Sequence, residues 1–175
     1  PDEAFRVPML TYIKPQIANW PEADYIVGNP PFIGNKRMRF HLGDGYVEAL
    51  RTAYEESIPK SADYVMFWWS KAGQLVASKS AQRFGLIATN SLTQVYNRKI
   101  VDAFLTENRG ASLVYAIPDH PWVDSVDGAA VRISMTVGTI GQSIGRLCEV
   151  VSEGTSDDLG RTVELRERAG VIAND

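Results

Sequence analysis

Short apolar runs alternate with apolar residues at helical spacing along most of the chain. Apolar runs that are typical of strands occur at residues 25–28, 84–89, 112–117, 129–139 and 147–151. Apolar residues that recur every three or four positions predict helices at residues 46–57, 62–77 and 98–107. Ser61 is a suitable N-cap for the second helix, and Gly110 is a suitable C-terminal cap for the third.

The order of these elements is strand, helix, helix, strand, helix and then further strands. Such alternation is typical of an α/β fold with a doubly wound sheet, and the last strands predict an antiparallel hairpin. We therefore expect residues 1–151 to form the C-terminal half of such a sheet. Residues 152–175 are more polar and are expected to be an edge element or a linker.

Composition excludes several classes of protein. The chain is 45% hydrophobic and 22% charged, so it can build a core. Its net charge of -3 indicates that this segment alone is not the main grip on a nucleic acid. No apolar run approaches the ~20 residues of a membrane span, so no membrane partner is expected.

Cysteine and histidine add two further expectations. The single cysteine, Cys148, cannot form an internal disulfide and favours a cytoplasmic location. His41 and His120 have no Cys or carboxylate partner at ligand spacing, so no metal site is expected.

The most informative motif is Asn29-Pro30-Pro31-Phe32, directly after the apolar run at residues 25–28. Two prolines leave a loop few conformations, and ligands of open α/β sheets bind where such loops project. The Asn29 amide oxygen and the Pro30 carbonyl oxygen can both accept hydrogen bonds from one exocyclic NH2 group, which would localise the nitrogen lone pair toward a methyl donor. Phe32 offers a face for an unstacked base. The motif therefore predicts methylation of an amino nitrogen on a flat, conjugated group; the alternative is a rigid loop whose Phe32 belongs to the core.

A series of segments resembles the catalytic domain of adenine-N6 DNA methyltransferases from single-chain bacterial restriction-modification enzymes of the type IIG and IIL kind. The series comprises Asn29-Pro30-Pro31-Phe32 with the turn at Gly34, Ser61-Ala62-Asp63-Tyr64 leading into Phe67, residues 84–91, Asn97-Arg98-Lys99 and residues 121–134. The resemblance implies a Rossmann-like class I methyltransferase fold, S-adenosylmethionine as the cofactor, and duplex DNA with a flipped target adenine as the partner.

The resemblance also implies roles for individual residues. The expected catalytic residues are Asn29, Pro30, Pro31 and Phe32. The expected cofactor-binding residues are Asn29, Asp63, Tyr64 and Phe67. The expected DNA-binding residues are Lys36, Arg37, Arg98, Lys99 and Trp122. A solvated basic face would explain Lys36 and Arg37 equally well, whereas the resemblance favours DNA for Arg98 and Lys99.

One departure from the family pattern concerns the cofactor. In the family, S-adenosylmethionine sits on a Gly-rich turn after the first strand. Gly43-Asp44-Gly45 is the nearest candidate here, but it follows the basic stretch at residues 35–41 rather than an apolar strand. We therefore expect an N-terminal cofactor half to precede Pro1 in a longer parent chain, and we expect the fragment alone to be inactive.

Two other functions fit the same motif. Enzymes that methylate guanine-N2 in RNA or a glutamine amide in protein use a similar Asn-Pro-Pro-aromatic loop, although the later series of segments favours the DNA enzymes. A non-catalytic methyltransferase-like binding module is the other alternative, and the intact Asn29 to Phe32 motif argues against it.

Overall fold

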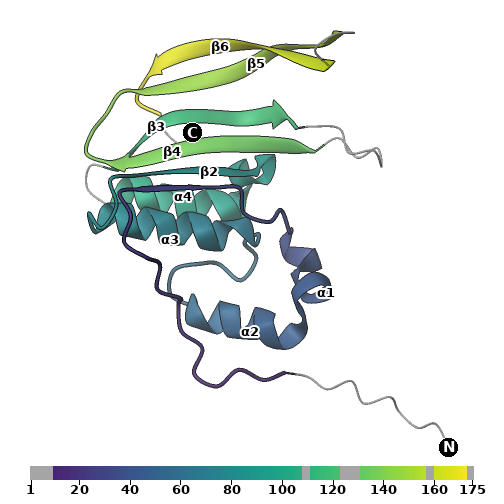
Figure 1. Cartoon of the computed structure of the whole chain (residues 1–175), viewed down its shortest axis with the longest axis vertical. Helices are drawn as coiled ribbons and strands as arrows, with labels where there is room; N and C mark the ends of the chain where they lie inside the picture. The colour runs from purple at the N-terminus through teal and green to yellow at the C-terminus, as the bar shows by residue number, and fades with distance from the viewer. Residues whose placement is uncertain (1–9, 108–110, 123–130, 157–159, 173–175) are drawn as a thin grey trace, which may run out of the picture.

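The computed structural model describes residues 10–107, 111–122, 131–156 and 160–172. These residues form one six-stranded sheet in the order β1-β2-β4-β3-β5-β6. The strands are β1 (Tyr25–Gly28), β2 (Arg83–Thr89), β3 (Ala111–Pro121), β4 (Arg132–Ile140), β5 (Gly145–Ser156) and β6 (Gly160–Gly170). The helices are α1 (Met38–Leu42), α2 (Asp44–Ala53), α3 (Val65–Ala77) and α4 (Val95–Glu107), with short 3-10 helices η1 (Asn35–Arg37) and η2 (Asn90–Thr93). Helices α3 and α4 lie against the sheet, whereas α1 and α2 lie further from it (Figure 1).

Strand directions determine which loops lie together. Strand β1 pairs with β2 in parallel, and β4 runs antiparallel to both β2 and β3. Strand β3 therefore runs in the same direction as β1 and β2. The segments that follow β1, β2 and β3 consequently leave the sheet at the same end, which we call the carboxyl end of the sheet.

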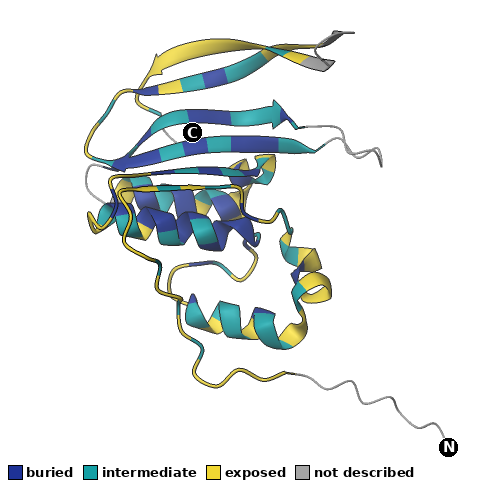
Figure 2. Ribbon diagram, viewed as in Figure 1, coloured by how far each residue is buried: buried dark blue, intermediate teal, exposed yellow. Residues whose placement is uncertain are grey.

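The core lies between α3, α4 and the sheet. Trp69 of α3, Phe84 of β2 and Phe104 of α4 form an edge-to-face cluster, with ring centroids 5.0 to 5.5 Å apart. Each such pair contributes about 0.5–1.5 kcal/mol beyond burial of area. The indole nitrogen of Trp69 donates a hydrogen bond of 3.0 Å to Thr136 Oγ1 of β4, so its polar atom is satisfied inside the core. Burial is concentrated in α3 and the middle strands, whereas β6 is exposed (Figure 2).

The predicted α/β fold and its terminal hairpin are confirmed, because β3 and β4 pair antiparallel and β5 and β6 form a second hairpin. Each predicted strand has a counterpart, and β3 and β5 are longer than expected. The boundary expected between residues 151 and 152 falls inside β5, and residues 160–170 form the edge strand β6. No described helix has the length and apolar character needed to cross a membrane.

Four helix ends differ from expectation, and the first is the start of α2, at Asp44 rather than at Tyr46. Helix α2 ends at Ala53 rather than at Ser57, because Tyr54 leaves the helical conformation and is buried. The prediction of Ser61 as the N-cap was wrong, because α3 starts only at Val65. Its N-cap residue is Tyr64, whose side chain makes no capping hydrogen bond. Helix α4 starts at Val95, three residues earlier than predicted. The expected cap at Gly110 lies outside the described residues.

Candidate functional site

The loop after β1 is anchored at both ends. Its start is fixed by parallel pairing of β1 with β2, which extends to Gly28 opposite Leu86. After the loop, the Ile33 carbonyl accepts a hydrogen bond of 2.9 Å from the amide of Tyr64. Between these anchors, Pro30 is buried, whereas Asn29 and Pro31 are exposed. Asn29-Pro30-Pro31-Phe32 is therefore a short, proline-stiffened loop held at the carboxyl end of the sheet.

Phe32 is the last residue of this loop, and its side chain is not part of the core. It is half-buried, and it is not among the described residues that pack against the main hydrophobic cluster, although its neighbour Ile33 is. The alternative in which Phe32 is a core residue is therefore not supported by its packing. A partly open aromatic ring at this position is available to a flat ligand.

A hollow of about 390 Å³ lies beside the loop. The residues Asn29, Pro30 and Pro31 form one side of it. Trp20 and Trp68 contribute aromatic walls, and the remaining lining residues are Ile26, Val27, Gly28 and Leu86. We call this the loop hollow.

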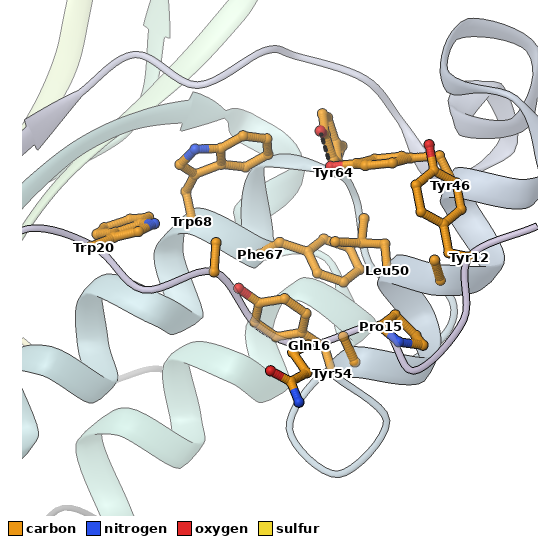
Figure 3. A pocket seen from close by; sticks show the side chains of 13 residues that line it. Tyr12, Pro15, Gln16, Trp20, Tyr46, Leu50, Tyr54, Tyr64, Phe67 and Trp68 are labelled. Atoms are coloured by element: carbon orange, nitrogen blue, oxygen red, sulfur yellow. Dashed lines mark hydrogen bonds between the residues drawn. The ribbon is translucent and has the colours of Figure 1, made fainter.

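An aromatic hollow of about 380 Å³ adjoins it (Figure 3). Its aromatic walls come from the N-terminal segment, from α2 and the turn after it, and from the start of α3, and they are Tyr12, Trp20, Tyr46, Tyr54, Tyr64, Phe67 and Trp68. Trp20 and Trp68 line both hollows, so the two hollows share a wall. Together they present an apolar, ring-rich surface beside the loop.

Tyr64 is held neutral in this aromatic hollow. Its hydroxyl lies 3.1 Å from that of Tyr46, and its ring centroid lies 4.5 Å from that of Trp68. Burial raises the pKa of the Tyr64 phenol above its usual value, and the hydrogen bond with Tyr46 raises it further. Burial also raises the pKa of Tyr54.

Asp63 connects three segments near the loop. Its Oδ1 accepts a hydrogen bond of 2.8 Å from the Asn35 amide, just after the loop. Its Oδ2 accepts hydrogen bonds of 2.6 Å from the Ser91 hydroxyl and 2.9 Å from Asn97 Nδ2. The Asp63 amide in turn donates to Asn97 Oδ1 at 3.0 Å. Asp63 lines neither hollow.

A second polar cluster joins the ends of β2 and β3. Asn90 Nδ2 donates to Asp119 at 3.3 Å, and Arg132 Nε donates to the same carboxylate at 2.6 Å. Arg132 also pairs with Glu153 at 2.8 Å. The hydrogen bond that Arg132 donates to Asp119 raises the pKa of its guanidinium most, and the one that it donates to Glu153 raises it further. Trp122 follows directly, and its amide donates to the Val131 carbonyl at 2.9 Å. The late motif at residues 123–130 lies outside the described residues.

The predicted basic residues differ in their surroundings. Lys36 and Arg37 are exposed on η1, which begins shortly after the loop, and neither makes an ion pair with the described part of the chain. Lys99 is exposed on α4 with its Nζ 5.9 Å from the Tyr96 ring, and Arg98 is half-buried on the same helix. Asn97, between them and η2, is only 3% exposed and belongs to the Asp63 cluster.

The predicted residues do not all meet at one place, and Phe32 and Asp63 line neither hollow. Asn29, Pro30 and Pro31 line the loop hollow, and Tyr64 and Phe67 line the adjoining aromatic hollow. Trp122 leaves the sheet at the same carboxyl end but is separated from β1 by β2 and β4. Within the described ranges, no group of three or more His, Cys, Asp or Glu residues could hold a metal ion.

No role was predicted from the sequence for Trp20, Trp68 or Ser91, and Asn97 was predicted only as part of the segment Asn97-Arg98-Lys99. Trp68 had a signal, since neighbouring residues on a helix point in different directions and Trp68 and Trp69 cannot both face the same core. Trp20 lies before β1, and no helical or strand pattern in the sequence connects it with the Asn29 motif. Likewise, no local pattern connects Asp63 with Ser91 or Asn97.

Comparison with known proteins places this fold in a family. The family described as the MmeI DNA-methyltransferase domain matches residues 2–148, whereas no curated protein matches the chain. Among solved structures, the type IIL restriction-modification enzyme MmeI in complex with DNA is 21% identical with a TM-score of 0.61, over 82% of this chain and 18% of MmeI. A protein described as a modification subunit of a type I restriction enzyme from Vibrio vulnificus YJ016 is 15% identical with a TM-score of 0.47, over 74% of this chain and 25% of that one. The chain thus spans less than a fifth of the length of MmeI, and it belongs to the family of the MmeI DNA-methyltransferase domain.

Proposed function

We propose that this chain carries the catalytic loop of a DNA methyltransferase that transfers a methyl group from S-adenosylmethionine to the N6 amine of an adenine flipped out of duplex DNA. The observation that carries the proposal is Asn29-Pro30-Pro31-Phe32, held at the carboxyl end of β1 beside an open hollow. Membership of the MmeI DNA-methyltransferase domain family supports the reaction class.

The chemistry follows from the acceptors on this loop. The N6 amine of adenine is a poor nucleophile because its lone pair is delocalised into the ring. The Asn29 amide oxygen and the Pro30 carbonyl oxygen accept hydrogen bonds from its two N–H groups and draw the lone pair toward the methyl donor. Transfer releases S-adenosylhomocysteine, and the methylated nitrogen then loses one proton to solvent. Because the loop is anchored at Gly28 and Ile33, these acceptors need little reorganisation when the base arrives. Phe32 stacks on the flipped base, and Pro31 keeps the loop stiff.

The aromatic hollow fits the adenine end of the cofactor. Tyr64 and Phe67, with Trp68 and Trp20 at the shared wall, offer uncharged rings at a distance from Asn29. When bound, S-adenosylmethionine supplies the electrophilic methyl group. Asn29 would contact the cofactor at the loop hollow, because it lines the wall nearest the proposed site of transfer.

Basic residues after the loop and on α4 suit the DNA backbone. Lys36 and Arg37 lie close after the catalytic loop, and Arg98 and Lys99 lie on α4. Phosphate contacts from such residues would orient the duplex without reading its sequence. Trp122 leaves the sheet at the same end and would press against the extruded base or the gap that it leaves.

The free edge of β1 suits the cofactor half of a longer parent chain. Strand β1 is an edge strand with a parallel partner on one side only, and Tyr25 and Val27 are 61% and 85% exposed. Exposed apolar edge strands are normally covered in native proteins. We propose that the preceding half of the sheet packs here, that the whole belongs to a restriction-modification enzyme, and that it acts on cytoplasmic DNA.

The test is product identity with the full-length protein. Labelled methyl from S-adenosylmethionine should appear as N6-methyladenine in duplex DNA, and Asn29→Ala should remove this product. Asn19→Ala is the matched control, because Asn19 is exposed and lines neither hollow, and it should leave the product unchanged. Label recovered only in RNA guanine or in protein glutamine would replace the DNA assignment by one of the alternatives.

A further inference from the structure

We propose that Asp63 is a positioning residue for the catalytic loop, and that it acts through hydrogen bonds to the chain rather than by contact with the cofactor. This inference rests on the proposed function, since it concerns the loop that carries Asn29. Asp63 lies between the loop and α3, and its carboxylate is the point at which the loop, η2 and α4 meet.

The contacts of Asp63 account for nearly all of its hydrogen-bonding capacity. A carboxylate offers about four acceptor positions, and three of them are taken by Asn35 N, Ser91 Oγ and Asn97 Nδ2. The side chain does not line the loop hollow or the aromatic hollow. A cofactor that lies in either hollow would therefore not contact the Asp63 carboxylate in this arrangement.

Asn97 completes the arrangement from the other side. Its Oδ1 accepts from the Asp63 amide, and its Nδ2 donates both to Asp63 and to the Ser91 carbonyl, at 2.9 Å each. Every polar atom of this buried amide thus has a partner. Because Asn97 is buried and its partners Asp63 and Ser91 are half-buried, this network favours one geometry and holds its members in place.

The network acts on the loop at one defined place. Asp63 Oδ1 holds the amide of Asn35, and the next residue along, Tyr64, holds the carbonyl of Ile33. These two bonds fix the chain directly after Phe32. Gly34, between them, has no side chain, and a Cβ there would meet Asp63 Oδ1 at 3.7 Å. Asp63 and Tyr64 together therefore fix the position of the loop relative to the start of α3.

Loss of the hydrogen bond from Asn35 to Asp63 would displace the acceptor atoms of Asn29 and Pro30 without removing them. Catalytic geometry is sensitive to shifts of about 1 Å, which can lower a rate by about 100-fold. Asp63→Asn keeps the size of the side chain but presents an NH2 group to Ser91 and Asn97, where donors already point. We expect kcat to fall by about 10- to 100-fold, with the KM values for S-adenosylmethionine and DNA within about twofold of wild type.

The experiment combines kinetics with amide hydrogen exchange, both on the full-length protein. The variants are Asp63→Asn and Asn97→Ala, and the control is Asp44→Asn, an exposed carboxylate on α2 whose partner is Arg39. In both network variants we expect the low kcat and faster exchange of the segment that contains Asn35. In the control we expect neither. Because exchange needs no substrate, the anchoring is tested even if the wild-type protein does not methylate adenine, a result that would refute the proposed function separately.

Two results would overturn the inference. A raised KM for S-adenosylmethionine with kcat unchanged in Asp63→Asn would make Asp63 a cofactor ligand, as the family resemblance first implied. Exchange of the Asn35 segment at the wild-type rate in Asp63→Asn would show that the carboxylate does not hold the loop.

Discussion

At the scale of single residues, the site depends on polar atoms that are held in one protonation state and one orientation. Asn29 and Pro30 offer neutral acceptors on a stiff loop, and Asp63 offers charged acceptors that the chain itself occupies. Tyr64 contacts both the loop and the aromatic hollow, since its amide donates a hydrogen bond to the Ile33 carbonyl and its ring lines the hollow.

The raised pKa of Tyr64 gives a pH-dependent prediction. The unfolded phenol ionises near pH 10, whereas the folded one resists ionisation because it is buried and bonded to Tyr46. Tyr64 therefore contributes its full stabilisation below about pH 10, and the contribution is lost as the pH rises toward the folded pKa. The phenolate absorbance of wild type minus that of Tyr64→Phe should show no Tyr64 signal at pH 10.

The control for this measurement is the same difference in strong denaturant. There the Tyr64 signal should be half developed near pH 10, as for a free phenol. An identical titration in native and denatured protein would contradict the buried, bonded state of this hydroxyl.

At the scale of elements, the strands were predictable because their signals are local. Continuous apolar runs identified β1 and β2, and the proline motif identified the loop between β1 and the helices. The helix ends were less accessible, because tertiary contacts set them: burial of Tyr54 ends α2, and the Asp63 cluster delays the start of α3. The part of the site built by Asp63 and Asn97 could not be predicted, since these residues are 34 positions apart and meet only through the fold.

The packing of β2 against β4 gives a paired prediction at two glycines. A Cβ at Gly138 would lie 2.3 Å from the Phe84 ring, which is locked between Trp69 and Phe104. Gly138→Ala should therefore destabilise the protein by about 1–3 kcal/mol through overpacking. A Cβ at Gly85 would lie at an ordinary 3.6 Å from Val137, so Gly85→Ala should be neutral or slightly stabilising. Denaturant unfolding of both variants checks the difference, and equal stability of the two would refute this account of the β2–β4 packing.

At the scale of the whole molecule, the chain corresponds to 18% of the length of MmeI. Strand β1 forms one edge of the sheet and has a described neighbouring strand on one side only. If the cofactor half covers this edge in the full-length protein, Val27 becomes buried there.

A charge at this edge tests that arrangement. Val27→Asp should lower the unfolding free energy of the full-length protein by about 2 kcal/mol or more, because a buried Val contributes about 1.5–3 kcal/mol. Val171→Asp is the matched control, since Val171 is also 85% exposed but follows β6 at the far side of the sheet. Thermal unfolding distinguishes the two, and equal, negligible losses would show that the β1 edge stays open to solvent.

The most direct test of the central claim is the single-turnover rate of methyl transfer to a duplex that contains one target adenine, with full-length protein and saturating S-adenosylmethionine. If Asn29 and Pro30 activate the amine, Asn29→Ala should lower this rate by about 100- to 1,000-fold while DNA affinity is retained. A rate within a few-fold of wild type, at equal occupancy of DNA, would show that the loop after β1 does not perform the chemistry.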